Sequence, residues 1–258
     1  MNLSSLSSAS SLYGANAISS RVSEALARPQ ARLEQQAEST RVQLSAYGQV
    51  RSATAQLESA ASKLQENKQL SSVDGLTKAV QGFADAVNGR LATVNRVSGN
   101  DSANRTSGVL ADDGKVRAAN NETRRTLEGV NGSNRDALKQ IGITVAQDGG
   151  VKVDRQALQN AFAANPDQVR QTLNSVGQQV ARQSTQQLSA TGSVSAPINR
   201  LNEQLGSIEQ RQADNQSRIE QSQQAVQQRD RQMAQAQQAV QQGFVFTGIP
   251  AYNRIFSS

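Results

Sequence analysis

The sequence predicts a mainly α-helical protein, with long antiparallel N- and C-terminal coiled-coil helices and a small α+β core that carries one β-hairpin. Apolar residues recur at the three- and four-residue spacing of a helical seam over residues 18–72 and 197–243. Between these segments, two β-branched runs are separated by an Asp-Gly-Gly turn. The 258 residues contain 3% aromatics and no Cys, His or Trp, which argues against one large globular core.

The N-terminal segment, residues 1–17, is a Ser-, Ala- and Asn-rich tract that we expect to be a disordered leader. It cannot bury enough apolar surface to order itself. Two interpretations are open, a frayed terminus and an unfolded leader that passes through a specialised export channel. The segment has no basic n-region and no apolar h-region, so a secretory signal peptide is not expected.

The first long helix is predicted over residues 18–72, and small side chains make up most of its seam. We expect the larger seam residues Leu33, Leu44, Tyr47 and Leu57 to pack against another helix. Pro29 lies near the beginning, where a proline is tolerated in a first turn or produces a kink.

An α+β core domain is predicted over residues 73–180. Its first two helices are expected over residues 76–97 and 114–128, with a polar, glycine-containing loop over residues 98–113 between them. A linker over residues 181–196 is expected to follow the core.

The second half of this core contains the strand signals. Residues 141–145 and 151–153 are β-branched runs, and the glycines between them allow the positive φ of a tight hairpin turn. Asp154 is well placed to cap a following helix. Asn165-Pro166-Asp167 is expected to end that helix and start the next.

The last helix is predicted over residues 197–243, where a four-and-three spacing holds for almost six heptads. One seam is apolar and the other becomes polar toward the C-terminus, which suits a helix whose burial is completed by neighbouring chains. The apolar tail 244–258 needs covering by its own chain or by another molecule, and we favour the latter. The expected assembly interface comprises Leu33, Leu44, Tyr47, Leu57, Leu205, Ile219, Val226, Met233, Val240, Phe244, Phe246, Tyr252 and Phe256.

The composition disfavours an enzyme, a cofactor and a metal site. Without His and Cys the chain has no imidazole base, no thiol nucleophile and no thiolate ligand. Asp112–Asp113 is an adjacent carboxylate pair that could act in acid–base chemistry, but a solvated turn is the favoured interpretation. The Asp148 turn lacks the repeated acidic positions of a cation-binding loop. We expect no catalytic residue.

The charge pattern disfavours nucleic acid as a partner, although the net charge is +6 and the sequence pI is about 10.1. The basic residues are spread along the chain and interleaved with acidic ones, and aromatic stacking partners are scarce. A nucleic-acid-binding rod remains a third alternative, which would show a steep salt dependence. No stretch approaches the roughly 20 apolar residues that cross a bilayer, so membrane insertion is not expected.

Two stretches of the sequence carry a family resemblance. The first runs from Arg28-Pro-Gln-Ala-Arg-Leu33 through Val42-Gln-Leu-Ser-Ala-Tyr-Gly-Gln-Val50 to Leu57. The second, more specific stretch is Leu138-Lys-Gln-Ile-Gly-Ile-Thr-Val-Ala-Gln-Asp-Gly-Gly-Val-Lys-Val-Asp154, continued by Leu158 and Ala163-Ala-Asn-Pro-Asp167. Together they resemble the flagellar hook-associated protein 2 family, the filament cap family. The resemblance implies a head of β-rich domains after the first helix, but here Leu76 follows Leu64 closely, so this is a shortened form.

The resemblance implies a structural axial protein that assembles at the hook or filament tip and assists flagellin polymerisation. Its implied partners are further copies of itself, flagellin, hook–filament junction proteins and a flagellar export chaperone. Its implied location is the extracellular flagellum, reached through the flagellar type III apparatus without a cleaved signal peptide. The alternative is a cytoplasmic coiled-coil adaptor or export chaperone for another flagellar protein.

Overall fold

The computed structural model describes the backbone of residues 4–66, 69–101 and 106–255, and the side chains of residues 27–66, 69–99 and 107–239. The chain divides into two units. The arm comprises residues 1–37 and 206–258, and the core domain comprises residues 38–205. Mainly helical structure with an antiparallel β-hairpin confirms the predicted fold class.

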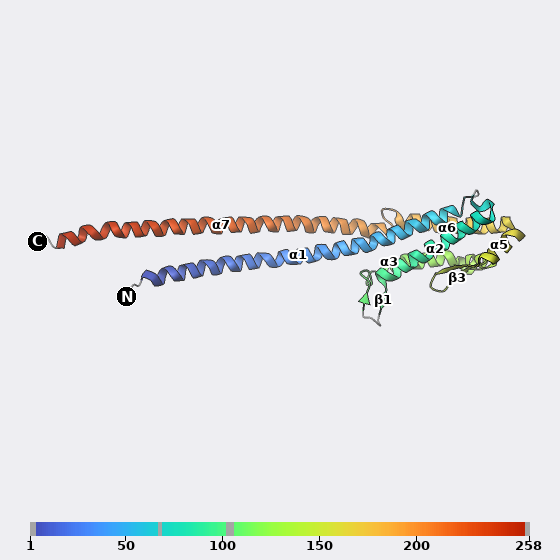
Figure 1. Cartoon of the computed structure of the whole chain (residues 1–258), viewed down its shortest axis with the longest axis horizontal. Helices are drawn as coiled ribbons and strands as arrows, with labels where there is room; N and C mark the ends of the chain where they lie inside the picture. Colours follow the sequence, from blue (N-terminus) through green and yellow to red (C-terminus); the bar gives the residue numbers. More distant parts are fainter. Residues whose placement is uncertain (1–3, 67–68, 102–105, 256–258) are drawn as a thin grey trace. The chain divides into compact units, whose positions relative to one another are not determined.

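Two long helices, α1 (Ser4–Lys63) and α7 (Ser195–Ile255), contribute to both units (Figure 1). Helix α1 begins in the arm and ends in the core domain, whereas α7 begins in the core domain and ends in the arm. Their arm segments are therefore antiparallel, as predicted.

The remaining helices belong to the core domain, and most of them have a short polar residue as the N-terminal cap. They are α2 (Val73–Ser98), α3 (Gly114–Glu128), α4 (Ser133–Gln140), α5 (Arg155–Ala164) and α6 (Pro166–Leu188), with 3₁₀ turns η1 (Gln69–Ser71) and η2 (Val130–Gly132). The side chains of Ser72, Asp113, Asp154 and Asn165 each accept a hydrogen bond from a backbone N–H in the first turn of α2, α3, α5 and α6. These bonds satisfy donors that the helix itself leaves free. The predicted roles of Asp154 and Asn165-Pro166-Asp167 are confirmed.

The predicted hairpin consists of β3 (Ile143–Val145) and β4 (Val151–Val153), with Thr144 opposite Lys152. Gly149 in the turn has φ +92°, a conformation that favours glycine. Asn88 of α2 ties this hairpin to the helices: its Nδ2 donates to the Val151 carbonyl at 2.8 Å, and its Oδ1 accepts from the Val151 N–H at 2.8 Å. The side-chain amide thus takes the place of a neighbouring strand.

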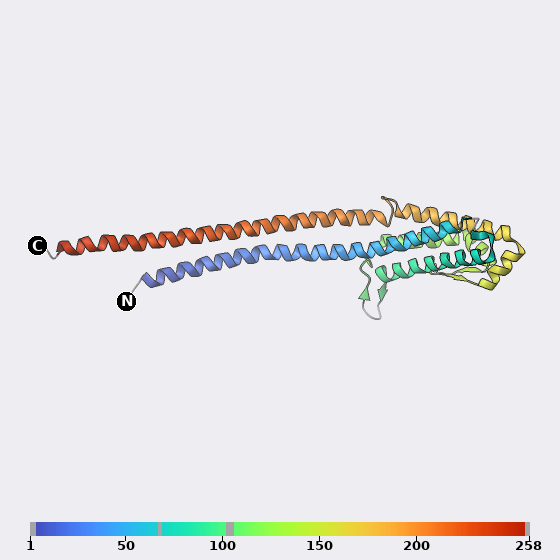
Figure 2. The same cartoon turned by 45° about the horizontal axis from the view of Figure 1, so that its top comes forward.

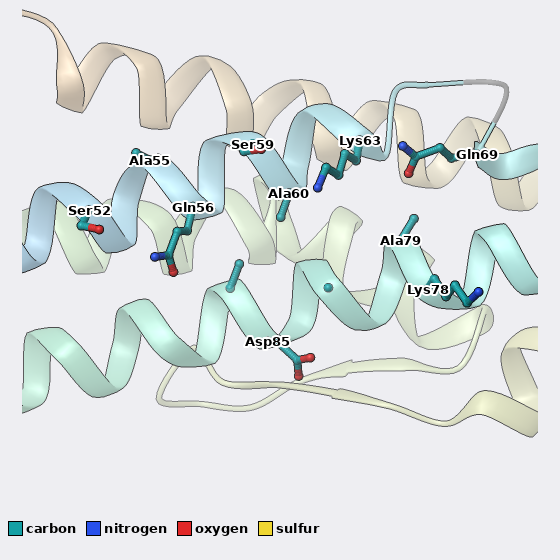
Figure 3. A pocket seen from close by; sticks show the side chains of 12 residues that line it. Ser52, Ala55, Gln56, Ser59, Ala60, Lys63, Gln69, Lys78, Ala79 and Asp85 are labelled. Atoms are coloured by element: carbon teal, nitrogen blue, oxygen red, sulfur yellow. The ribbon is translucent and has the colours of Figure 1, made fainter.

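Helix α2 lies between α1 and the hairpin, as Figures 2 and 3 show. Its apolar stripe, including Leu76, Phe83 and Val87, is buried against residues of α1, α5, α6 and the hairpin. A second buried cluster surrounds Tyr47 and Val94 and includes Leu110 and Val194. Most of the core is thus supplied by aliphatic side chains at helical spacing, consistent with the low aromatic content.

The helix bounds differ from the predicted ones in several places. The first helix was predicted to continue to residue 72, but α1 ends at Lys63 and the 3₁₀ turn η1 lies between it and α2. Helix α1 begins at Ser4, so residues 4–17 are helical where a disordered leader was expected; α6 continues to Leu188, well into the expected linker 181–196; and α7 extends to Ile255 through most of the expected tail. Extending an existing helix adds one hydrogen bond per residue without a new nucleus, so weakly patterned segments follow their neighbours.

Two elements of the core domain lacked a clear sequence signal. The loop 98–113 contains a two-residue antiparallel pairing between β1 (Asn100–Asp101) and β2 (Thr106–Ser107). Helix α4 begins at Ser133, directly after the 3₁₀ turn η2, and was not among the predicted helices. Elements this short have too few residues to show a period.

Candidate assembly surfaces

The arm segment of α7 shows the predicted seam in its pattern of burial. Steps of alternately four and three residues from Leu201 define the seam, and between residues 206 and 228 they give Ile208, Gln212, Asn215, Ile219, Ser222 and Val226. These six side chains are buried or half-buried, and all the others in this range are exposed. Ile208 is the most covered, at 4% exposure, and Ile219 and Val226 are half-buried. The four-and-three spacing therefore identifies the covered face of the helix.

The arm segment of α1 supplies the opposite side of this seam. Leu33 and Ala37 are buried, at 7% and 1% exposure. Farther along, the Nδ2 of Asn215 donates to the Oε1 of Gln30 at 3.1 Å. A polar pair on a helical seam contributes less stability than an apolar one but specifies register.

Coverage of the α7 seam decreases toward the C-terminus. All described side chains from residue 227 to 239 are exposed, including Met233 at 38%. The side chains of Val240, Phe244, Phe246 and Tyr252, and all of Phe256, lie outside the described residues. The arm therefore presents a seam that its own chain covers only in part.

Four of the predicted interface residues lie in the core domain. Tyr47 and Leu57 are almost completely buried by the domain's own helices, at 1% and 0% exposure, so we reassign them to the intramolecular core. Leu44 and Leu205 are half-buried. An assembly role for the remaining predicted interface residues stays a prediction.

Asp113 of the candidate carboxylate pair has two structural roles. One oxygen accepts from the Lys115 N–H at 2.8 Å and caps α3, and the other accepts a hydrogen bond from the Tyr47 hydroxyl. Burial, and then this carboxylate, raise the pKa of Tyr47 above its ordinary value. Asp112 is exposed. Asp113 therefore caps α3 and bridges it to α1.

Sequence reasoning missed a buried arginine at the centre of the core domain. Arg90 of α2 is 1% exposed and donates to the hydroxyl of Thr54 at 3.1 Å, to Asn120 Oδ1 at 3.0 Å and to Gln187 Oε1 at 3.0 Å. These acceptors lie on α1, α3 and α6, so one side chain joins four helices. Gln187 in turn donates to the Ala119 carbonyl at 3.0 Å.

Burial of this guanidinium lowers the pKa of Arg90 to about 10, while nearby Glu122 opposes the shift. A signal for its position was present, because residue 90 follows Val87 by three and precedes Val94 by four, on the buried face of α2. Charged residues are mostly exposed, so the helical spacing of Arg90 was not taken as a sign of burial.

A groove of about 760 Å³ runs between α1 and α2 and is lined largely by short side chains (Figure 3). Ser52, Ala55 and Ser59 line it from α1, and Lys63 and Lys78 lie toward one end. Within the described residues, no group of three or more acidic side chains could hold a metal ion, and no helix is long and apolar enough to span a membrane.

A family model described as the flagellar hook-associated protein 2 C-terminus matches residues 64–242 of the chain. This range covers all of the core domain after α1 and most of the arm segment of α7. A comparison with curated proteins finds no match.

Proposed function

Because this chain belongs to the flagellar hook-associated protein 2 family, we propose that it is a structural protein of the filament cap type. It would assemble at the hook or filament tip and assist flagellin polymerisation. Its partners would be further copies of itself, flagellin, hook–filament junction proteins and an export chaperone. The protein would act by assembly, not by catalysis.

The partly covered seam of the arm is the observation that carries this proposal. Ile219 and Val226 are half-buried and Met233 is exposed, although all three lie on the apolar side of the same helix. Burying the rest of such side chains contributes about 25 cal/mol per Å² of apolar surface. Neighbouring copies or other axial proteins can supply that burial.

The short connection between α1 and α2 limits the proposal to functions that need no inserted head domains. Helix α1 ends at Lys63 and α2 begins at Val73, so only residues 64–72 stand where the family resemblance implies inserted head domains. The proposal therefore includes no function that such head domains would carry. Export through the flagellar type III apparatus and an extracellular location at the flagellum complete the proposal.

Deletion of the gene tests cap activity. We expect mutant cells to release unpolymerised flagellin into the medium and to carry short or no filaments, with the wild-type gene restoring filament length. Filaments of normal length in the deletion strain would contradict the proposal. A chain retained in the cytosol, in a stable complex with one secreted client, would instead favour the adaptor or chaperone alternative.

Seam variants test whether the arm carries this function. Replacing Ile219 and Val226 together by Asn should abolish complementation, because it makes the covered face of α7 polar. The matched control replaces Gln216 and Gln223 by Asn, which lie seven residues apart on the exposed side of the same helix. Equal complementation by both variants would remove the arm from the proposed mechanism.

A further inference from the structure

The core domain carries a second candidate assembly contact, formed by the two ends of α3. At the C-terminal end is an open groove of about 640 Å³ between α3, η2 and α6, which we call the arginine groove. Arg125 and Arg182 line it, and no acidic side chain does. Both arginines are exposed, and neither forms an ion pair with a described residue.

Two further residues line the arginine groove: Val130, whose apolar side chain is uncovered, and Gln183, whose amide has no hydrogen bond within the described residues. Val130 is 81% exposed, more than any other large apolar side chain in the described part of the chain. The amide nitrogen and oxygen of Gln183 are both buried and have no hydrogen-bond partner within the described residues. Leaving a buried polar group unpaired is unfavourable, so a ligand that pairs it gains affinity.

At the opposite end of α3 is a short segment, residues 108–112, which we call the Val109 loop. Val109 is 50% exposed and Asp112 is exposed, and both line the same surface hollow, beside Lys115. Leu110 anchors the loop, because its side chain is buried and its N–H donates to the Val97 carbonyl at 2.7 Å. The loop is thus held in place while its apolar Val109 and acidic Asp112 side chains are exposed.

The two ends of α3 are complementary in charge and in apolar character. The Val109 loop offers a valine and a carboxylate without an ion-pair partner among the described residues, and the arginine groove offers a valine and two arginines. The ends are separated by the 15 residues of α3, about 22 Å at 1.5 Å per residue. The Val109 loop therefore cannot bind the arginine groove of its own chain.

We propose that the arginine groove binds the Val109 loop of a second copy of this chain. Val109 would cover Val130, and Asp112 would pair with Arg182 or Arg125. The side chain of Gln183 would rotate, so that its amide hydrogen-bonds the loop's main chain. The contact joins different surfaces of two copies, and such heterologous contacts build rings or helical rows. The inference rests on the proposed function, to which it adds the residues of one subunit contact.

Cysteine cross-linking tests the contact directly, because the chain contains no natural cysteine. Full-length Val109→Cys and Val130→Cys proteins are mixed and oxidised. We expect a disulfide-linked dimer from the mixture, little from either variant alone, and a ladder of higher species from the double variant. The matched control pairs Val130→Cys with Val42→Cys, whose wild-type side chain is 40% exposed on α1. Equal cross-linking with Val42→Cys, or none with Val109→Cys, would overturn the proposal.

Charge exchange supplies a second test, read as mass in solution by sedimentation velocity. Asp112→Arg and Arg182→Asp should each lower self-association at least tenfold, because each places like charges in contact. Mixing the two should restore it, since every contact then joins an arginine to an aspartate. Failure of the mixture to recover would contradict the proposed pairing. Asp136→Arg, an exposed change on α4, is the control, and circular dichroism confirms folding.

These outcomes separate this inference from the proposed function. Unchanged self-association in both charge variants, together with normal filament growth, would overturn the groove contact and leave the cap proposal intact. Protection of Val130→Cys by added flagellin, and not by a second copy, would assign the groove to another axial protein and overturn the inference.

Discussion

The core domain and the arm are built from the same two long helices but bury their side chains to different extents. Leu57 of α1 is 0% exposed in the core domain, whereas Met233 of α7 is 38% exposed in the arm. The core domain covers α1 with α2 and α6, while each arm helix has one described partner helix. A helical seam becomes a core only when enough neighbouring elements cover it.

The buried polar groups of the core domain and of the arm also differ in how many helices they join. In the core domain, Arg90 is buried and bonded to three other helices, which leaves little freedom in how those helices pack. In the arm, Asn215 and Gln30 form a neutral, partly buried pair. Hydrogen bonds from one buried cation thus join the helices of the core domain, whereas a single neutral pair joins the arm helices at this point of the seam.

Truncating a core leucine should have the largest effect. Leu57→Ala removes a fully buried side chain and is expected to lower the free energy of unfolding by about 2–5 kcal/mol. Met233→Ala in the arm should change it by no more than about 0.5 kcal/mol. Urea unfolding followed by circular dichroism measures both, and equal effects would break the distinction between the two regions.

Removing the buried guanidinium should have the next largest effect. Arg90→Met leaves acceptors on Thr54, Asn120 and Gln187 without their donor, at about 1 kcal/mol each, so we expect a loss of about 3 kcal/mol. Arg211→Met on the exposed face of the arm is the control and should be nearly neutral. A neutral Arg90→Met would show that apolar packing alone holds the four helices.

Adding one methyl group should change stability in opposite directions in the two regions. A Cβ at Gly177 would lie 2.7 Å from the Ala61 carbonyl oxygen and 2.9 Å from Leu64 Cβ, so Gly177→Ala should cost about 1–3 kcal/mol. A Cβ at Gly206 of α7 meets nothing within 4 Å, so Gly206→Ala should stabilise the protein by about 0.5–1 kcal/mol. Thermal unfolding of the two variants checks the signs.

The smallest expected effect concerns the tyrosine hydroxyl. Tyr47→Phe loses the bond to Asp113 and should cost about 1 kcal/mol at neutral pH. The pKa of Tyr47 is raised above its ordinary value of 10.0, so above pH 10 the unfolded chain releases this proton while the folded chain retains it. The hydroxyl's contribution is therefore complete below pH 10 and decreases as the pH rises further. Denaturation at pH 8 and pH 11 should show the difference between wild type and Tyr47→Phe narrowing.

Much of the fold could be predicted because its signals are local or periodic. The hairpin, the cap at Asp154, the change of helix at Asn165-Pro166-Asp167 and the seam of α7 as far as Val226 all occur as expected. The candidate surfaces were harder to predict. Tyr47 and Leu57 have the same helical spacing as Leu33, and spacing alone does not distinguish a partner helix in the same chain from one in another.

By itself, the sequence determined the helical periods, the turn and cap positions and the family, because these depend on residues close together in the chain. Only the tertiary structure decided which seam residues are covered, that Arg90 is buried among four helices, and that the Val109 loop and the arginine groove lie at opposite ends of α3. Those properties depend on residues distant in sequence, such as Thr54 and Gln187, whose proximity no local pattern encodes.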